Sequence, residues 1–208
     1  MSLAQANREP GLVTVEEFFS LVPEGQKADL IDGVIYMASP DSPVHNRLAC
    51  FVQFLMQGYA RGRSLGDIYV SRVAFVLSEW RAPEPDIAFL CAERLGDVQP
   101  GRINGGPDIA VEIVSHESRT RDYVEKKRLY EEAGVSEYWL VDPIQRRVEF
   151  FRLEAGRYAL APLEQNRIFR SRALPGFWLN VDWLLADPLP DENACLREIN
   201  QGAGGAAS

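Results

Sequence analysis

The feature that most constrains the fold is the apolar run at residues 109–114, because it contains one charged side chain, Glu112. The run is short, rich in β-branched residues and uninterrupted, which is typical of a central strand covered on both faces. A lone carboxylate there would lose its hydration, at a cost of several kcal/mol. Glu112 must therefore be paired with a metal ion, a cation or hydrogen-bond donors, or else be protonated.

Length and composition indicate one globular domain. The chain has 208 residues, of which 46% are hydrophobic and 25% charged, so it can bury a sizeable core. We expect a loose leader over residues 1–12, a single domain over residues 13–190, and a C-terminal tail over residues 191–208 that is disordered at its end. No apolar stretch approaches the roughly 20 residues that cross a bilayer. The start of the chain also lacks the pattern of a signal peptide.

Charge and cysteine content limit the partners and the compartment. The net charge is −8, whereas a nucleic-acid-binding protein usually shows a basic footprint. Any such footprint must be local, and residues 61–63, 119–128 and 167–172 are the candidates, with solvated surface charge as the alternative for each. The three cysteines form no Cys-x-x-Cys pair. This argues against a disulfide framework or a zinc cluster and favours a cytoplasmic protein.

Hydrophobic periodicity predicts helices and strands in mixed order. Thr14 begins a capping box that predicts the first helix, and Asp32-Gly33 predicts a hairpin. Ser42-Pro43 opens a second helix, of about eighteen residues, and a third is expected over residues 120–133. Strands are expected at residues 28–31, 34–38, 67–71, 74–78, 86–91, 109–114, 137–141, 148–153 and 157–160, with a Gly-rich loop at residues 101–106. The fold class is therefore α/β, bordering on α+β, with a mixed central sheet flanked by helices and additional β-hairpins.

Alternation along the Glu112 strand gives it one unusual face. The even positions, including Asp108 and Glu112, share a face, whereas the odd positions form a fully apolar one. Pro85-Asp86 begins another apolar strand, so an acid at the start of one strand stands beside an acid inside another. This is how oxygen ligands for Mg²⁺ or Mn²⁺ are commonly brought together.

The helix after Glu112 supplies a cation. Asp122, Lys126 and Tyr130 are spaced i, i+4 and i+8, so they share the face expected to pack on the sheet. A lysine at the edge of a carboxylate pair could orient or deprotonate a metal-activated water. Two structural alternatives stay open. Asp122 and Lys126 could form a helix-surface pair, and Glu112 with Lys126 could be a buried ion pair that need not stabilise the fold.

Several motifs together resemble a known family. They are Pro85-Asp86, Gly106-Pro107-Asp108-Ile109-Ala110-Val111-Glu112-Ile113-Val114-Ser115, the residues Asp122, Lys126, Tyr130 and Gly134 at four-residue spacing, and Val135-Ser136-Glu137-Tyr138-Trp139-Leu140-Val141-Asp142-Pro143. Asp29-Leu30-Ile31-Asp32-Gly33 and His45 lie upstream of them. Over about residues 14–160 the chain resembles the Putative restriction endonuclease family of bacterial proteins, within the PD-(D/E)XK nuclease superfamily.

The resemblance implies a restriction-endonuclease-like core that acts on DNA with Mg²⁺ or Mn²⁺. Asp86 would be the metal-binding Asp, and Glu112 would be the acid of the (D/E)-x-K strand. The metal would lie between these carboxylates, a backbone carbonyl near Ile113 and the scissile phosphate. The superfamily's Lys stands two residues after the acid, where this chain has Val114. Lys126 from the following helix therefore takes its place, with Lys127 as the nearest misassignment.

Three further residues are candidate accessories. Asp29 stands where the family usually has Glu, and its shorter arm would weaken or move a second metal site. Asp108 matches the family as either a ligand or a cap at the start of its strand. His45 lies at a helix N-terminus, where free backbone donors favour a phosphate, but the sequence alone favours a surface histidine.

These observations predict a Mg²⁺-dependent DNA endonuclease, homodimeric because cutting two strands favours two sites. A catalytically silent nuclease-fold domain for interaction or regulation is the first alternative, favoured by the acidic charge. The second is a metal-free hydrolase with two carboxylates about 5–10 Å apart, such as a glycosidase. The motifs and the lysine favour the nuclease.

Overall fold

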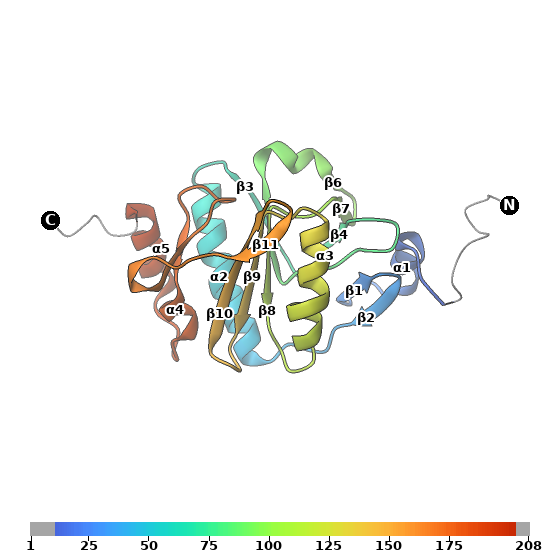
Figure 1. Cartoon of the computed structure of the whole chain (residues 1–208), viewed down its shortest axis with the longest axis horizontal. Helices are drawn as coiled ribbons and strands as arrows, with labels where there is room; N and C mark the ends of the chain where they lie inside the picture. The colour runs from blue at the N-terminus through green and yellow to red at the C-terminus, as the bar shows by residue number, and fades with distance from the viewer. Residues whose placement is uncertain (1–10, 203–208) are drawn as a thin grey trace.

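A six-stranded mixed sheet forms the centre of the molecule (Figure 1). The computed structural model describes residues 11–202, and the order of the central sheet is β11-β10-β9-β8-β5-β3. The strands are β3 (Gly66–Val70), β5 (Ile87–Cys91), β8 (Ile109–Ile113), β9 (Glu137–Asp142), β10 (Arg147–Glu154) and β11 (Arg157–Leu160). Strands β8 and β9 are parallel, and the other neighbouring pairs are antiparallel.

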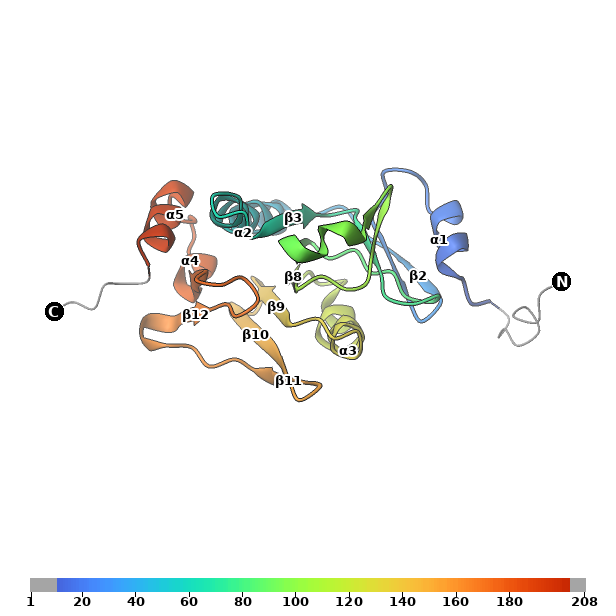
Figure 2. The same cartoon turned by 90° about the horizontal axis from the view of Figure 1, so that it is seen from above.

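Helices cover both faces of this sheet (Figure 2). Helix α2 (Pro43–Arg61) covers one face, and α3 (Lys127–Glu132) covers the other. The odd positions of β8 pack into the larger apolar core with α2, whereas Ala110 and Val114 pack with Leu129 and Tyr130 of α3. The strand is thus covered on both sides, as its composition predicts.

Smaller elements lie beyond the central sheet at both ends of the molecule. Helix α1 (Val15–Leu21) and the hairpin of β1 (Ala28–Ile31) and β2 (Val34–Met37) lie at one end, and the C-terminal helices lie at the other (Figures 1 and 2). The remaining elements are β4 (Ala74–Val76), a 3-10 turn η2 (Ala92–Asp97), β6 (Val98–Gln99), β7 (Arg102–Asn104), a π-helix η3 (Arg121–Lys126), a 3-10 turn η4 (Gln165–Arg167), β12 (Ile168–Arg170), β13 (Trp178–Asn180), α4 (Val181–Leu185) and α5 (Glu192–Gln201).

Local sequence signals begin the N-terminal elements where expected. Thr14 and Glu17 form the reciprocal capping box of α1. Ser42 caps α2 by accepting a hydrogen bond from the backbone N–H of His45. Asp32 and Gly33 take φ angles of 49° and 80°, the left-handed pair that a two-residue hairpin turn of this kind requires.

Three expected segments differ from the structure. The Gly-rich loop at residues 101–106 contains strand β7, which pairs with β4 and β6. The helix expected over residues 120–133 divides into η3 and α3. The segment expected to be a tail from residue 191 contains α5, whose Cys195 and Ile199 are buried in the main core. The rest of that tail, residues 203–208, lies outside the described residues, as do residues 1–10 of the expected leader.

The predicted fold class is confirmed, because a mixed central sheet with flanking helices dominates the structure. None of the helices within residues 11–202 is both long enough and apolar enough to cross a membrane.

Candidate active site

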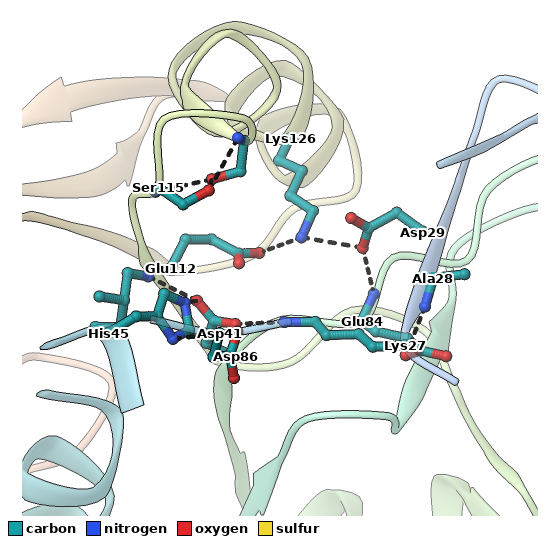
Figure 3. A network of polar contacts seen from close by, with 12 residues as sticks. Lys27, Ala28, Asp29, Asp41, His45, Glu84, Asp86, Glu112, Ser115 and Lys126 are labelled. Carbon is teal, nitrogen blue, oxygen red and sulfur yellow. Dashed lines mark hydrogen bonds and ion pairs between the residues drawn. The ribbon is translucent and has the colours of Figure 1, made fainter. Parts of the chain in front are cut away.

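The two central strands place Asp86 and Glu112 side by side. Strands β5 and β8 are antiparallel, with Ile87 opposite Val111. Continuing this register by one residue places Asp86 opposite Glu112, where cross-strand side chains are direct neighbours. Figure 3 shows both carboxyl groups at the same end of the sheet, close to Lys126 and His45.

Asp86 is surrounded by donors. Its Oδ1 pairs with the Lys27 ammonium, and its Oδ2 accepts from the backbone N–H of Ile113 at 2.7 Å and lies 3.1 Å from His45 Nε2. Although burial raises the pKa of Asp86, the Lys27 charge and the His45 hydrogen bond hold it well below its usual range. Asp86 is therefore ionised at neutral pH. In return, Asp86 raises the pKa of His45 against the opposing effect of burial.

Glu112 is as deeply buried as the sequence predicts, with 2% of its surface exposed. Its Oε1 accepts from Lys126 Nζ at 2.8 Å and from the Tyr130 hydroxyl at 3.4 Å. Burial raises the pKa of Glu112 to about 8, and the Asp86 and Asp122 charges add to the shift while Lys126 opposes it. Every hydrogen bond and ion pair that reaches this carboxyl from residues 11–202 ends on Oε1. The second oxygen, Oε2, has no such partner among these residues.

Lys126 links Glu112 to the β1–β2 hairpin. Its Nζ lies 3.0 Å from Asp29 Oδ1, and only 2% of the lysine is exposed. Asp29 also accepts from the backbone N–H of Glu84 at 2.8 Å and lies 3.4 Å from Arg121 Nε. Burial opposes the charge of Lys126, but the carboxylates, Asp29 foremost, raise its pKa above the ordinary value. Lys126 therefore stays an ammonium ion.

The helical segment that carries Lys126 begins as a π-helix, η3, and continues as α3. Such π-segments are rare and are found frequently at functional sites. Here the segment buries both Asp122 and Lys126 against the sheet. Burial raises the pKa of Asp122 to about 6. The surface pair considered for these two residues is excluded by their burial.

Of the other residues singled out from the sequence, His45 lies at Asp86, whereas Asp108 and Lys127 lie outside the cavity. His45 is 7% exposed and contacts Asp86, so its interpretation as a surface histidine is wrong. Asp108 lies at the opposite end of β8, where it accepts from the backbone N–H of Cys91 at 2.7 Å, which is the role of a cap. Lys127 lies over the ring of Phe151, 3.7 Å from its centroid, and does not line the cavity at Asp86.

The sequence did not point to Lys27 or Glu84. Lys27 directly precedes β1, and Glu84 lies two residues before Asp86, where its carboxylate accepts from the backbone N–H of Ala28 at 3.2 Å. Burial raises the pKa of Glu84 to about 7. The two-residue spacing to Asp86 was an available signal for Glu84, since alternate residues of an extended segment share a side. No local pattern marks Lys27, because it meets Asp86 from 59 residues away.

A cavity of about 210 Å³ reaches the loop between β2 and α2, and its lining includes Lys27, His45, Asp86, Glu112 and Lys126. Its lining holds six carboxyl groups and three Lys or Arg side chains, a formal excess of three negative charges. Such an excess fits a site for a cation. Within residues 11–202 no three His, Cys, Asp or Glu side chains are arranged as a metal cluster. The two acids that the strands place side by side in this cavity are Asp86 and Glu112.

A mixed sheet whose central strands carry neighbouring carboxylates defines the chain as a protein of nuclease-like fold. It belongs to the Uma2 family, described as "Putative restriction endonuclease", whose model matches residues 15–182. Among solved structures, the chain is similar to a putative nuclease belonging to DUF820 from Anabaena variabilis ATCC 29413, with a TM-score of 0.69. The two share 17% sequence identity over 83% of this chain and 97% of the other, so the likeness shows the fold alone. No curated protein matches the chain.

Proposed function

We propose that the chain is a Mg²⁺- or Mn²⁺-dependent endonuclease that hydrolyses DNA phosphodiester bonds at Asp86, Glu112 and Lys126. One observation carries this proposal. The Asp86 and Glu112 carboxyl groups are neighbours in a polar cavity, and a charged lysine buried with them leaves Glu112 Oε2 unpaired. Membership of a family described as restriction endonucleases supports the reaction type.

The donor set suits a hard divalent cation that keeps much of its own water. Mg²⁺ is usually bound by one or two carboxylates, with waters and substrate phosphates completing the shell. Asp86 and Glu112 would hold it, with the backbone carbonyl near Ile113 as a third donor. Bound there, such a cation lowers the pKa of a coordinated water and offsets the charge that develops on phosphate.

Lys126 keeps Glu112 ready for this task. Its ammonium group lies 2.8 Å from Glu112 Oε1 and opposes the pKa rise that burial causes. Because its own pKa is raised, Lys126 does not accept a proton near neutral pH. We therefore assign it an orienting and charge-stabilising role rather than the role of a general base. His45 orients Asp86 in the same way, through the hydrogen bond to Oδ2.

The state of the cysteines bears on the cellular compartment, and the reaction bears on the oligomeric state. The three cysteines are free: Cys50 is exposed, Cys91 partly buried and Cys195 buried. This is consistent with a reducing cytoplasm. A homodimer would supply the two sites that cleavage of both DNA strands favours. Sedimentation of the full chain with and without duplex DNA measures its oligomeric state.

The alternative function is that of a catalytically silent nuclease-fold domain for interaction or regulation. It is favoured by the ion pairs that occupy Asp86 and Glu112 and by the net charge of −8. Nicking of supercoiled plasmid with Mg²⁺ or Mn²⁺ separates the two functions. The nuclease predicts nicking by the wild type that is lost in Asp86→Asn and Glu112→Gln and retained in Glu16→Gln, a change at an exposed surface acid. If the wild type cleaves neither DNA nor RNA above the level of the two site variants, the proposed nuclease is wrong and the catalytically silent domain is the remaining function.

A further inference from the structure

Lysines are scarce in this chain and concentrated at the cavity. The sequence has three, Lys27, Lys126 and Lys127, and the first two line the cavity. Each of these two ends on a different acid of the pair, Lys27 on Asp86 and Lys126 on Glu112 (Figure 3). Each of the two acids that would bind the proposed metal therefore already carries a lysine ammonium group.

The two lysines are held differently. Lys126 is 2% exposed and is fixed between two carboxylates, at 2.8 Å and 3.0 Å. Lys27 is 17% exposed and enters from the segment before β1, and its one ion pair within residues 11–202 is with Asp86. A lysine ammonium on a flexible four-carbon stem can move into water without disturbing the backbone. Lys27, more exposed and held by one ion pair, is better placed for that movement than Lys126, which is held by two.

Lys27 occupies the Asp86 oxygen that is not held by the fold. Its Oδ2 is used by the backbone N–H of Ile113, which belongs to the sheet, and by His45, which is buried in α2. Its Oδ1 is used by Lys27. A cation that binds Asp86 therefore competes with Lys27 at Oδ1, because the other two donors are fixed by the fold and the ammonium charge repels a second cation on the same oxygen.

We propose that Lys27 is the internal counter-ion of Asp86, that a divalent cation displaces it, and that its freed ammonium group then contacts the substrate phosphate in the same cavity. The proposal rests on the proposed function, since it needs a metal site at Asp86 and Glu112. It assigns opposite effects to one residue. Lys27 weakens metal binding by competition and strengthens binding of the anionic substrate.

Titration calorimetry with Mn²⁺ tests the competition on the full chain. Lys27→Met removes the competing charge and should bind Mn²⁺ up to about 5-fold more tightly than the wild type, the upper end of the range expected for loss of one ion pair near the surface. Lys127→Met makes the same change of charge outside the cavity and should leave the affinity unchanged. At saturating Mn²⁺, Lys27→Met should nick plasmid more slowly than the wild type despite its tighter metal binding. Equal or weaker metal binding by Lys27→Met would overturn the proposal.

Chemical labelling provides a test that needs no variant, so a folding defect in Lys27→Met cannot decide the outcome. The wild type is acetylated briefly with and without Mg²⁺, and each lysine is quantified by mass spectrometry. Displacement predicts that Mg²⁺ increases the labelling of Lys27, while Lys126 stays protected and Lys127 reacts equally in both samples. Unchanged or reduced labelling of Lys27 would contradict the proposal.

The results also separate this proposal from the function on which it rests. If the wild type binds Mn²⁺ more tightly than Glu112→Gln but equals Lys27→Met, the metal site stands and the role of Lys27 fails. If neither the wild type nor Lys27→Met binds Mn²⁺, both the metal site and the role of Lys27 fail.

Discussion

Glu112 and Glu137 are buried carboxyl groups on neighbouring parallel strands, 2% and 1% exposed, yet their surroundings differ completely. Both oxygens of Glu137 are occupied. It accepts four hydrogen bonds, from Trp139 Nε1 at 3.1 Å, Ser171 Oγ at 2.8 Å and the backbone N–H groups of Arg172 and Ala173 at 2.6 Å and 3.3 Å, and Arg152 Nε lies 3.6 Å away. Glu112 has a lysine and a long tyrosine contact on one oxygen and faces the cavity with other acids.

The comparison separates a structural carboxylate from the one that we propose to bind a metal. Glu137 joins strand β9 to the segment that follows β12, and four neutral donors together with the Arg152 guanidinium satisfy its carboxylate. Glu112 is buried next to like charge, which costs stability in the absence of a cation. Burial alone therefore does not mark a site; an incompletely satisfied acid beside a second acid does.

The largest effect is expected on catalysis at Glu112. Glu112→Gln keeps the size of the side chain and an acceptor for Lys126 but removes the charge. Plasmid nicking should fall on the order of 10³-fold, the loss typical of removing one charge-stabilising group. The free energy of unfolding, measured in urea at neutral pH, should change by less than about 1 kcal/mol, because a pKa of about 8 leaves Glu112 largely protonated there and the amide has the same size.

Glu137→Gln should show the reverse pattern. The amide cannot accept on both of its terminal atoms, so some of the donors that converge on this side chain lose their partner. We expect a loss of about 3 kcal/mol in the free energy of unfolding, as for other buried ion pairs that lose one partner. Nicking per folded molecule should stay within about 3-fold of the wild type. If Glu137→Gln nicks much more slowly than the wild type while its free energy of unfolding is unchanged, the two glutamates do not differ in the way proposed.

Metal should stabilise the protein through Glu112 and not through Glu137. At 100 times its dissociation constant, Mg²⁺ stabilises a protein by about 2.7 kcal/mol. Thermal melts in EDTA and in Mg²⁺ should show this gain for the wild type and for Glu137→Gln. The gain should be absent in Glu112→Gln. A gain of equal size in Glu112→Gln would place the metal elsewhere.

The smallest effect concerns pH and extends the comparison to Glu84. Burial raises the pKa of Glu84 to about 7 in the folded state, whereas an unfolded chain has about 4.3. The folded state therefore binds the proton more tightly than the unfolded state does. As pH rises from about 4.3 to about 7, Glu84 progressively lowers the free energy of unfolding, and above about pH 7 the full loss is present. Glu84→Gln cannot ionise, and its stability relative to the wild type should rise by on the order of 2 kcal/mol between pH 5 and pH 8 in EDTA. A difference independent of pH would show that Glu84 is not held protonated by burial.

Local signals were sufficient for most of the central fold and part of the site. The capping box at Thr14 and the turn at Asp32-Gly33 depend on adjacent residues alone, and the structure has both. The burial of Glu112 and Lys126 follows from strand and helix periodicity, which the sequence carries directly.

What the sequence could not supply are contacts between distant segments. Lys27 and His45 reach Asp86 from 59 and 41 residues away, so no spacing rule connects them. Helix α5 was missed because the segment is short and polar on one face. Its cap at Asp191 and the apolar pair Cys195 and Ile199 are a weak signal until α2 is present to cover them.

The central claim is that Glu112 holds a metal together with Asp86, and a crystal structure with Mn²⁺ at a wavelength where it scatters anomalously tests this most directly. The account predicts one anomalous peak within about 2.2 Å of an oxygen of Asp86 and of Glu112 Oε2, with Lys126 still at Glu112 Oε1. Full Mn²⁺ occupancy at another site, with Lys27 on Asp86 and Lys126 on Glu112 and nothing between the two acids, would contradict it.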